Sequence, residues 1–218
     1  MNLYEKSLNL EQHLSNSTLA LPDHIVSQNS KTGQSFRSLL RFCSHRTHLC
    51  SQRCYACRGP ISWAASVSKA IAVRRWIEQN GIEVSAKRMA TEIYYGGIFR
   101  WMDRGDFDPL TVLLANRVVE LRPDVSYCAF SRNLDALKSL NPKINKVYSV
   151  DNRSLGTIHQ VPNSIKIAFM KTDTCTPIPK VVKIVFPINH RKNLLGSSID
   201  CSFFKDKRVK CAGCRRCY

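Results

Sequence analysis

The sequence lacks any hydrophobic run long enough to cross a lipid bilayer, which takes about 20 consecutive apolar residues. Residues 1–29 also lack the apolar core of a secretory signal peptide, and they include two glutamates. We therefore expect a cytoplasmic protein with no membrane partner. Thiols stay reduced in that compartment, so the ten cysteines are expected to bind metal rather than to form disulfides.

Acidic residues are scarce: 16 Asp and Glu stand against 33 Lys and Arg, which leaves a formal net charge of +17. The segment 31–77 contains nine basic residues and no acidic one. A field of this sign attracts polyanions, most often nucleic acid, although a solvated basic face has the same composition. We predict a nucleic-acid partner. The basic residues expected to contact it are Arg41, Arg46, Arg53, Arg58, Arg74, Arg75, Lys207, Arg208, Lys210, Arg215 and Arg216.

The remaining composition is that of an ordinary globular protein, with 44% hydrophobic and 9% aromatic residues in a chain of 218. This length is sufficient for one sizeable core. We expect a polar, irregular lead-in over residues 1–35 and an α/β core over 36–200 that contains the first cysteines. A cysteine cluster over 201–218 is expected to pack on that core. The sequence predicts no particular oligomeric state.

Hydrophobic periodicity predicts the local structure of the first half of the core. A short apolar run favours a strand over 36–42, directly before the first cysteines. Apolar residues then recur at helical spacing over 62–79, where Asn80 and Gly81 end the helix. A second helix is expected over 85–94.

Strands and helices alternate in the second half. Asp108 and Pro109 form a helix start, with an N-cap residue followed by a proline at the first helical position. Alternation at this spacing predicts parallel strands with right-handed crossovers. Five or six strands are too few for a complete eight-stranded barrel, so we predict an open, partial α/β barrel. The expected elements are strands over 97–102, 125–130, 146–150, 165–170 and 181–186, a helix from 109 to 121, and a short helix capped by Ser131.

Eight of the ten cysteines fall into two groups of four, and four thiolates saturate one tetrahedral zinc or one iron–sulfur cluster. A zinc ribbon would place two C-x2-C pairs about 15–20 residues apart, whereas the C-x2-C pairs here lie far apart. The ending C-x2-C-x2-C matches three ligands of a ferredoxin-type cubane, so we predict 4Fe–4S clusters, with zinc as the alternative. The groups are Cys43, Cys50, Cys54 and Cys57, and Cys201, Cys211, Cys214 and Cys217.

The predicted sheet places the first cysteine group beside carboxylates. Ligands of parallel α/β proteins gather at the carboxyl ends of the strands. The run of Cys50, Cys54 and Cys57 follows the first strand at that edge, and the turn from Asp103 to Asp106 follows the next one. Either Cys43 or Cys57 can complete the group, since both lie within reach. Cys128 falls inside a strand and is expected in the core.

The chain resembles the gene product 88 family of bacteriophages and related mobile elements. The features that carry this resemblance are the spacing Cys43-x6-Cys50-x3-Cys54 and the segments 99–107, 123–132 and 209–218. Together they extend over most of residues 36–218. The resemblance implies a protein of phage or mobile-element type, and it implies no defined biochemical activity.

A wider resemblance is to radical S-adenosylmethionine enzymes, in which a C-x3-C-x2-C loop after the first strand binds a cubane. It implies cluster ligation by Cys50, Cys54 and Cys57, and binding of S-adenosylmethionine by Gly105 and Asp106, with Asp103 or Asp106 as catalytic candidates. The family's Gly-Gly-Glu turn is replaced here by Arg104-Gly105-Asp106, which lacks the double glycine and has the shorter acid. In that family three cysteines bind three irons of the cubane, and the fourth iron stays open for the cofactor. Cys43 is foreign to this pattern, and a fourth thiolate from it could close the open iron.

Three functions therefore compete. The first is an iron–sulfur protein with a radical-enzyme-like fold that acts on or with nucleic acid. The second is a radical S-adenosylmethionine enzyme that modifies a nucleic acid or a protein. The third is a nucleic-acid-binding module in which zinc only fastens the loops.

Overall fold

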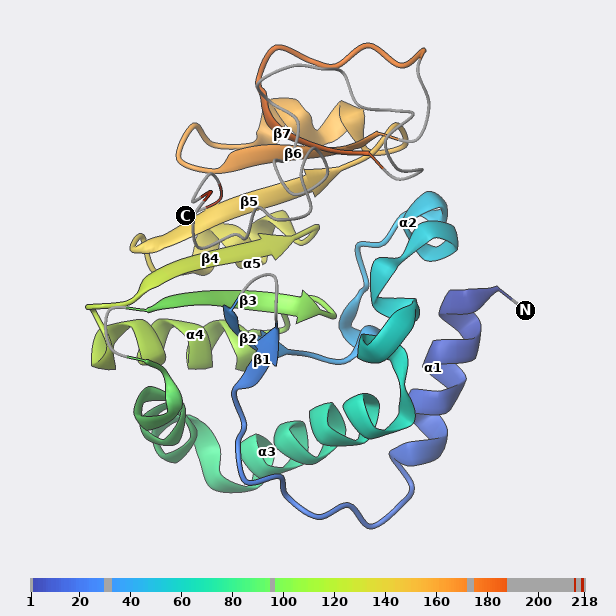
Figure 1. Ribbon diagram of the computed structural model, residues 1–218. Helices are drawn as coiled ribbons and strands as arrows, with labels where there is room; N and C mark the ends of the chain where they lie inside the picture. Colours follow the sequence, from blue (N-terminus) through green and yellow to red (C-terminus); the bar gives the residue numbers. More distant parts are fainter. Residues whose placement is uncertain are drawn as a thin grey trace.

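The computed structural model describes residues 2–29, 33–94, 97–171 and 175–187, together with Cys214 and Cys217. The described chain forms one sheet of seven strands whose spatial order follows the order in the sequence (Figure 1). β1 pairs antiparallel with β2, and every later pair of neighbours is parallel. The strands are β1 (Ser27–Asn29), β2 (Gly33–Arg37), β3 (Ile98–Arg104), β4 (Ser126–Ser131), β5 (Ile144–Val150), β6 (Lys166–Lys171) and β7 (Val182–Pro187).

The helices are α1 (Leu3–Leu14), α2 (His48–Arg53), α3 (Ala64–Glu92), α4 (Pro109–Leu121) and α5 (Leu134–Ser139), with 3-10 turns η1 (Leu40–Phe42), η2 (Tyr55–Cys57), η3 (Gly59–Ser62) and η4 (Leu155–Gln160). The helices α3, α4 and α5 cover one face of this sheet, whereas α1 and α2 lie beyond the carboxyl ends of its strands (Figure 1). Right-handed crossovers that always add the next strand on the same side place their connecting helices on the same face. Within the described residues, no helix is both long and apolar enough to span a membrane.

The predicted α/β class and the open, mostly parallel sheet are confirmed. The helix start at Asp108 is also confirmed, because its carboxylate accepts a hydrogen bond from the Thr111 amide at 3.2 Å. The helix break expected at Asn80 and Gly81 is confirmed, because α3 consists of two helices that meet at a kink at Gly81, which has a non-helical φ of 75° and ψ of 176°. Two local predictions are corrected. The strand expected over 36–42 lies at Gly33–Arg37, and α5 is capped by Asn133 instead of Ser131.

The expectation of an irregular lead-in is wrong for residues 3–14, which form α1. Asn2 and Glu5 form a reciprocal capping box at its N-terminus. One side of α1 is buried, and the Tyr4 hydroxyl donates to the carbonyl oxygen of Leu40 at 2.7 Å. This helix has little local signal in the sequence because its apolar residues follow no clean period. Its role is to pack against the segment that leads to the first cysteines.

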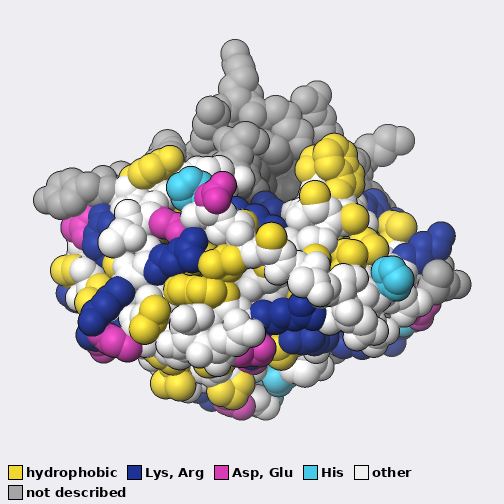
Figure 2. Space-filling model, turned by 90° about the horizontal axis from the view of Figure 1, so that it is seen from below, with side chains coloured by type: hydrophobic (Ala, Val, Ile, Leu, Met, Phe, Trp, Pro, Cys, Tyr) yellow, Lys and Arg dark blue, Asp and Glu magenta, His cyan; other side chains and the backbone are white. Residues whose placement is uncertain are grey.

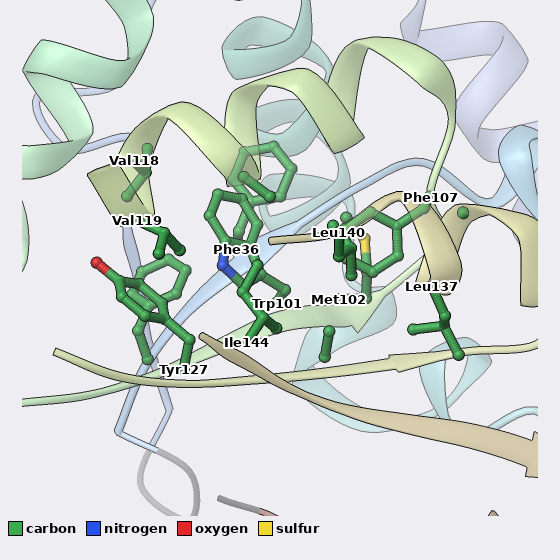
Figure 3. Close-up of a cluster of buried hydrophobic side chains, with 14 of the residues drawn as sticks. Phe36, Trp101, Met102, Phe107, Val118, Val119, Tyr127, Leu137, Leu140 and Ile144 are labelled. Carbon is green, nitrogen blue, oxygen red and sulfur yellow. The ribbon is translucent and has the colours of Figure 1, made fainter. Parts of the chain in front are cut away.

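The main core lies between the sheet and the helices α3, α4 and α5 (Figure 3). Trp101 is fully buried at its centre, with ring centroids 5.4 Å from Phe36 and 5.1 Å from Phe99. The opposite face of the sheet carries a smaller cluster built on Val147, Ala168 and Ile184. Cys128 is buried in its strand, as predicted.

Candidate functional site

The carboxyl ends of the parallel strands meet a segment that we call the cysteine loop, residues 43–57, which lies beyond the arrowheads of β3 and β4 in Figure 1. β3 is irregular where it reaches this edge. Ser35 of β2 pairs with Arg100 of β3, and Arg37 pairs with Arg104. An advance of two residues along β2 therefore matches an advance of four residues along β3, which is a β-bulge. Met102 takes a left-handed φ of 60° within this bulge. The bulge redirects the last side chains of β3 toward new partners.

Asp103 is tied to β2 and is unavailable to the cysteine loop. Its carboxylate accepts a hydrogen bond from the Ser35 hydroxyl at 2.8 Å and forms an ion pair with Arg37 at 3.1 Å. The same arginine donates to the Ser66 hydroxyl of α3. The Asp103 side chain therefore serves packing between the sheet and α3. Its backbone carbonyl oxygen faces the loop instead, and accepts from the Tyr55 hydroxyl at 2.7 Å.

Arg104 clamps the loop from both ends. Its guanidinium pairs with Glu11 of α1 at 3.1 Å and donates to the carbonyl oxygen of Ile61 at 2.9 Å. Glu11 in turn accepts from the amide of Leu40 at 2.8 Å and from that of Arg41 at 3.2 Å. Both charged side chains are buried, so the loss of either would leave the other as an uncompensated charge in the interior. The turns before and after the cysteine loop are thereby fixed to the end of β3.

Gly105 occupies a position that only glycine can fill without distortion. It has φ of 75°, and a Cβ atom there would lie 2.7 Å from the backbone carbon of Ser38 and 2.8 Å from the carbonyl oxygen of Leu39. The backbone entering the cysteine loop therefore rests directly on the turn after β3. This contact explains the glycine structurally, independently of any cofactor.

Asp106 faces the cysteine loop. Its carboxylate accepts hydrogen bonds from the Ser131 hydroxyl and from the Phe107 amide, the latter at 2.8 Å. Burial raises the pKa of Asp106, and its charge in turn contributes to raising the pKa of Cys43. No salt bridge to Asp106 exists within the described part of the chain. The structure thus separates the two candidate acids: Asp103 holds β2, and Asp106 borders the thiols.

An ion pair at the ends of β4 and β5 holds the middle of the loop. Arg132 pairs with the buried Asp151 at 2.8 Å, and Asp151 also accepts from the Thr47 hydroxyl. Thr47 caps α2 by accepting from the Cys50 amide at 3.0 Å. Burial raises the pKa of Cys50, and the charge and hydrogen bond of Arg132 offset this rise only in part. Arg132, Asp151 and Thr47 belong to the site although the sequence did not single them out.

The four thiols of the cysteine loop are neighbours. Cys43, Cys54 and Cys57 pack in one small cluster with Tyr4 and Leu40, and Cys50 lies close enough to raise the pKa of Cys43. The Cys54 thiol donates a hydrogen bond to Cys57, which lowers the pKa of Cys57 to about 7. Among the described residues, no three His, Cys, Asp or Glu side chains are arranged to hold a single metal ion.

The C-terminal cysteine group is described in part. Cys217 packs on the face of the sheet opposite the helices, near Phe130 and Phe186, in a cluster separate from that of the cysteine loop. Cys214 is half-buried. The other predicted site residues of this region lie outside the described residues, and they are Cys201, Lys207, Arg208, Lys210, Cys211, Arg215 and Arg216.

The comparison with known families rests on nearly the whole chain, because the sequence profile of the family described as "Gene product 88" matches residues 3–218. The chain belongs to the gene product 88 family. This confirms the first resemblance drawn from the sequence. No curated protein and no solved structure matches the chain. The wider resemblance to radical S-adenosylmethionine enzymes has no support in these comparisons and stays a prediction.

The basic residues of this gene product 88 protein divide by exposure. Arg41, Arg46, Arg53 and Arg58 are exposed around the cysteine loop. Arg74 instead pairs with Glu78 and Asp108. Arg75 donates to backbone oxygens after α1, including that of Ser17 at 2.8 Å. The first set is therefore exposed to solvent, although Arg46 also donates to the carbonyl oxygen of Cys43 at 2.9 Å. Arg74 and Arg75 hold helices together.

Charges are distributed differently on the underside of the molecule. Figure 2 shows separate groups of basic side chains with acidic ones beside them. On the helical layer Arg117 pairs with Glu83 at 2.7 Å and with Glu120 at 2.8 Å, and Lys87 also reaches Glu83. The segment 31–77, which contains the cysteine loop, has no acidic residue of its own, and Arg37 and Arg74 pair with acids from outside it.

Proposed function

We propose that this gene product 88 protein binds an iron–sulfur cluster, of the 4Fe–4S type, in its cysteine loop and acts on or with nucleic acid. One observation carries the proposal: the four-thiol loop follows the first parallel strand and is fastened over the carboxyl edge of the sheet. The fastening uses the Glu11–Arg104 pair and the Thr47–Asp151 contact. Ligands of parallel α/β proteins bind at this edge.

The donor set suits a cluster. Cys43, Cys50, Cys54 and Cys57 supply four soft thiolate ligands, which iron–sulfur clusters and zinc both accept. In a cubane each thiolate binds a different iron, so the thiols need not converge on one point as they would around zinc. Arg104 and Arg58 lie near Cys57 and favour its thiolate form. A bound cluster would supply one-electron transfer at this edge of the sheet.

The nucleic-acid partner is supported by the charge around the loop. Four exposed arginines, Arg41, Arg46, Arg53 and Arg58, surround the thiols. The net charge of +17 adds a long-range attraction for phosphates. A polyanion drawn to this surface would arrive at the same edge of the sheet that bears the proposed cluster.

A radical S-adenosylmethionine enzyme is the second candidate, and the position of Asp106 favours it. Its buried carboxylate lies at the end of β3, beside the cysteine loop, and forms no salt bridge within the described residues. An ammonium group bound there would supply the missing counter-charge and bring its raised pKa down. A partial barrel would have the same strand order, from β2 to β7, with its helices on one face. In this interpretation Asp106 binds the amino group of the cofactor.

Anaerobic purification followed by metal analysis and absorption spectroscopy tests the first proposal. We expect iron and sulfide in equal amounts, and an absorption band at about 400 nm from thiolate-to-iron charge transfer. Cys50→Ala and Cys54→Ala should lose the part of this absorption that comes from the cysteine loop and keep only that of any cluster on the C-terminal cysteines, whereas Cys175→Ala, which removes an exposed thiol outside the loop, should keep all of it. Comparing Cys43→Ala with Cys57→Ala identifies which thiol completes the set. A colourless protein with stoichiometric zinc would contradict the proposal and leave the zinc-stabilised module.

Incubation of the reduced, iron-loaded protein with S-adenosylmethionine tests the second candidate. Cleavage of the cofactor by the wild type, and its loss in Asp106→Ala at unchanged iron content, would support an enzyme. Asp103→Ala is a poor probe because that side chain holds Arg37 and Ser35. An iron-loaded wild type that leaves the cofactor intact would eliminate this candidate and retain the first.

A further inference from the structure

Two large aromatic side chains are exposed on the segment that ends the cysteine loop and leads into α3. Tyr55 is 57% exposed and Trp63 is 64% exposed. We call residues 55–63 the rim segment, which comprises η2, η3 and the N-cap residue of α3. A single exposed ring is common on protein surfaces, but two rings on one short segment beside a candidate site offer a large apolar area to a ligand.

The rim segment is held firmly although its rings are exposed. The Tyr55 hydroxyl donates to the carbonyl oxygen of Asp103 at 2.7 Å, which fixes the ring at the end of β3. Arg104 donates to the carbonyl oxygen of Ile61 at 2.9 Å and fixes η3 to the same strand end. A surface that is ordered before binding loses less conformational entropy when a ligand arrives.

The charge of the rim segment is entirely positive. Arg58 is exposed between the two aromatic residues. Two acids lie near the segment: Asp103, whose backbone oxygen accepts from Tyr55, and Glu11, which shares Arg104 with Ile61. Both are buried, Asp103 in an ion pair with Arg37 and Glu11 in one with Arg104. The rim segment therefore offers two aromatic rings and one exposed guanidinium. That combination binds single-stranded nucleic acid, because every base has a π-face and every nucleotide a phosphate.

We propose that the rim segment binds single-stranded nucleic acid, with bases stacked on Tyr55 and Trp63 and Arg58 on the phosphate backbone. This inference rests on the nucleic-acid partner of the proposed function and narrows it to unpaired strands. A duplex hides the faces of its bases within the helix, so a stacking surface selects strands that are not paired. Bound bases would lie next to Cys54 and Cys57, at the end of the cysteine loop.

Titration of the full-length, anaerobically purified protein with labelled oligothymidine and with a duplex of equal length tests this inference. The single strand should bind more tightly than the duplex. Trp63→Ala should weaken single-strand binding about tenfold, whereas Trp63→Phe keeps a ring and should retain most of the affinity. Tyr94→Ala is the matched control, because Tyr94 is also 64% exposed but lies beyond the other end of α3.

Salt dependence separates stacking from phosphate contact. Arg58→Ala should reduce the slope of log affinity against log salt by about 0.7, whereas Trp63→Ala should lower the affinity and leave the slope unchanged. Lys87→Ala, which removes an exposed cation on α3, should leave both unchanged. Quenching of tryptophan fluorescence by the single strand should disappear in Trp63→Phe, since Trp101 is fully buried and Trp76 is partly buried.

Two results would overturn the inference: equal single-strand affinity in Trp63→Ala and Tyr94→Ala, or equal affinity of the wild type for duplex and single strand. Iron measured on the same samples keeps the proposals distinguishable. If the iron-loaded wild type binds neither the single strand nor the duplex, both this inference and the proposal of a nucleic-acid partner are overturned. A protein without iron that still binds single strands through Trp63 would overturn only the cluster.

Discussion

The helix-covered face of the sheet and its carboxyl edge bury side chains of opposite kinds. Phe99, Trp101 and Tyr127 fill the helix-covered face, where rings pack edge to face. The edge instead buries charged groups, Arg104, Asp106 and Asp151 among them. The difference shows that β3 contributes apolar packing along its length and ionic clamps at its end.

Charges at the edge are not ordinary stabilising contacts. Burying an ion pair costs desolvation that the attraction within the pair only partly offsets. At this edge the pairs join segments far apart in sequence: Glu11 to Arg104, and Thr47 through Asp151 to Arg132. What they secure is the position of the cysteine loop. The helix-covered face therefore determines the stability of the fold, and the edge determines the geometry of the site.

The largest effect is expected on the helix-covered face. Trp101→Ala removes a fully buried ring that touches Phe36 and Phe99, and should lower the free energy of unfolding by about 4 kcal/mol through the cavity it leaves. Urea denaturation measures this. Val84→Ala, at an exposed position on α3, is the control and should cost little. A cost below 1 kcal/mol (about the size of a surface substitution) for Trp101→Ala would contradict this location of the core.

Removing one partner of the Glu11–Arg104 pair should have a smaller but still large effect. Glu11→Ala leaves Arg104 buried without its counter-charge and should cost about 3 kcal/mol. It also frees the amides of Leu40 and Arg41, so the loop should loosen. Alkylation of Cys43 in the metal-free protein should then become faster. Unchanged alkylation with reduced stability would show that the pair supports the fold without fastening the loop.

Two glycines with the same backbone angle offer a matched test of the edge. Gly105 and Gly81 both have φ of 75°, but a Cβ at Gly105 meets the backbone of Ser38 and Leu39, whereas one at Gly81 meets nothing within 4 Å. Gly81→Ala should cost roughly 1–3 kcal/mol from backbone strain alone, and Gly105→Ala should cost more because overlap with Ser38 and Leu39 adds to the strain. Equal costs in thermal or urea denaturation would contradict the close approach at Gly105.

Asp106→Asn should have the smallest effect on stability and the opposite sign. The raised pKa of Asp106 means that its ionised form is disfavoured in the fold, so wild-type stability falls as pH rises above the ordinary carboxyl value of about 4. Asparagine cannot ionise, and its oxygen can still accept from Ser131 and Phe107. The free energy of unfolding of the variant should equal that of the wild type at about pH 4 and exceed it at neutral pH. A variant that is less stable at neutral pH would contradict this.

The sequence predicts β3 to β7 and α4 well because each has a local signal, whereas β1 was not predicted and β2 lies earlier than expected. Asp108 and Pro109 mark the start of α4 within two adjacent residues, and buried strands are short apolar runs. The position of the cysteine loop directly after the first parallel strand correctly predicts that it lies at the carboxyl edge of the sheet. Arg132 and Asp151 could have been found by the same rule, since each directly follows a strand.

Other features of the site depend on contacts that no local pattern encodes. Glu11 lies in a helix with no clean apolar period, and its partner is 93 residues away. Asp103 and Asp106 are equivalent in the sequence, and only the bulge at Met102 directs one toward β2 and the other toward the thiols. The exposure of Trp63 was also hidden, because at the start of a helix it reads as part of the apolar face.

Iron content of two anaerobically purified proteins tests the central claim most directly. The comparison is between the wild type and a variant in which Cys50, Cys54 and Cys57 are all replaced by alanine, with the C-terminal cysteines intact. We expect the wild type to contain about four more irons per chain than the variant, while both unfold at the same urea concentration after iron removal. Equal iron in the two proteins would contradict the assignment of a cluster to the cysteine loop.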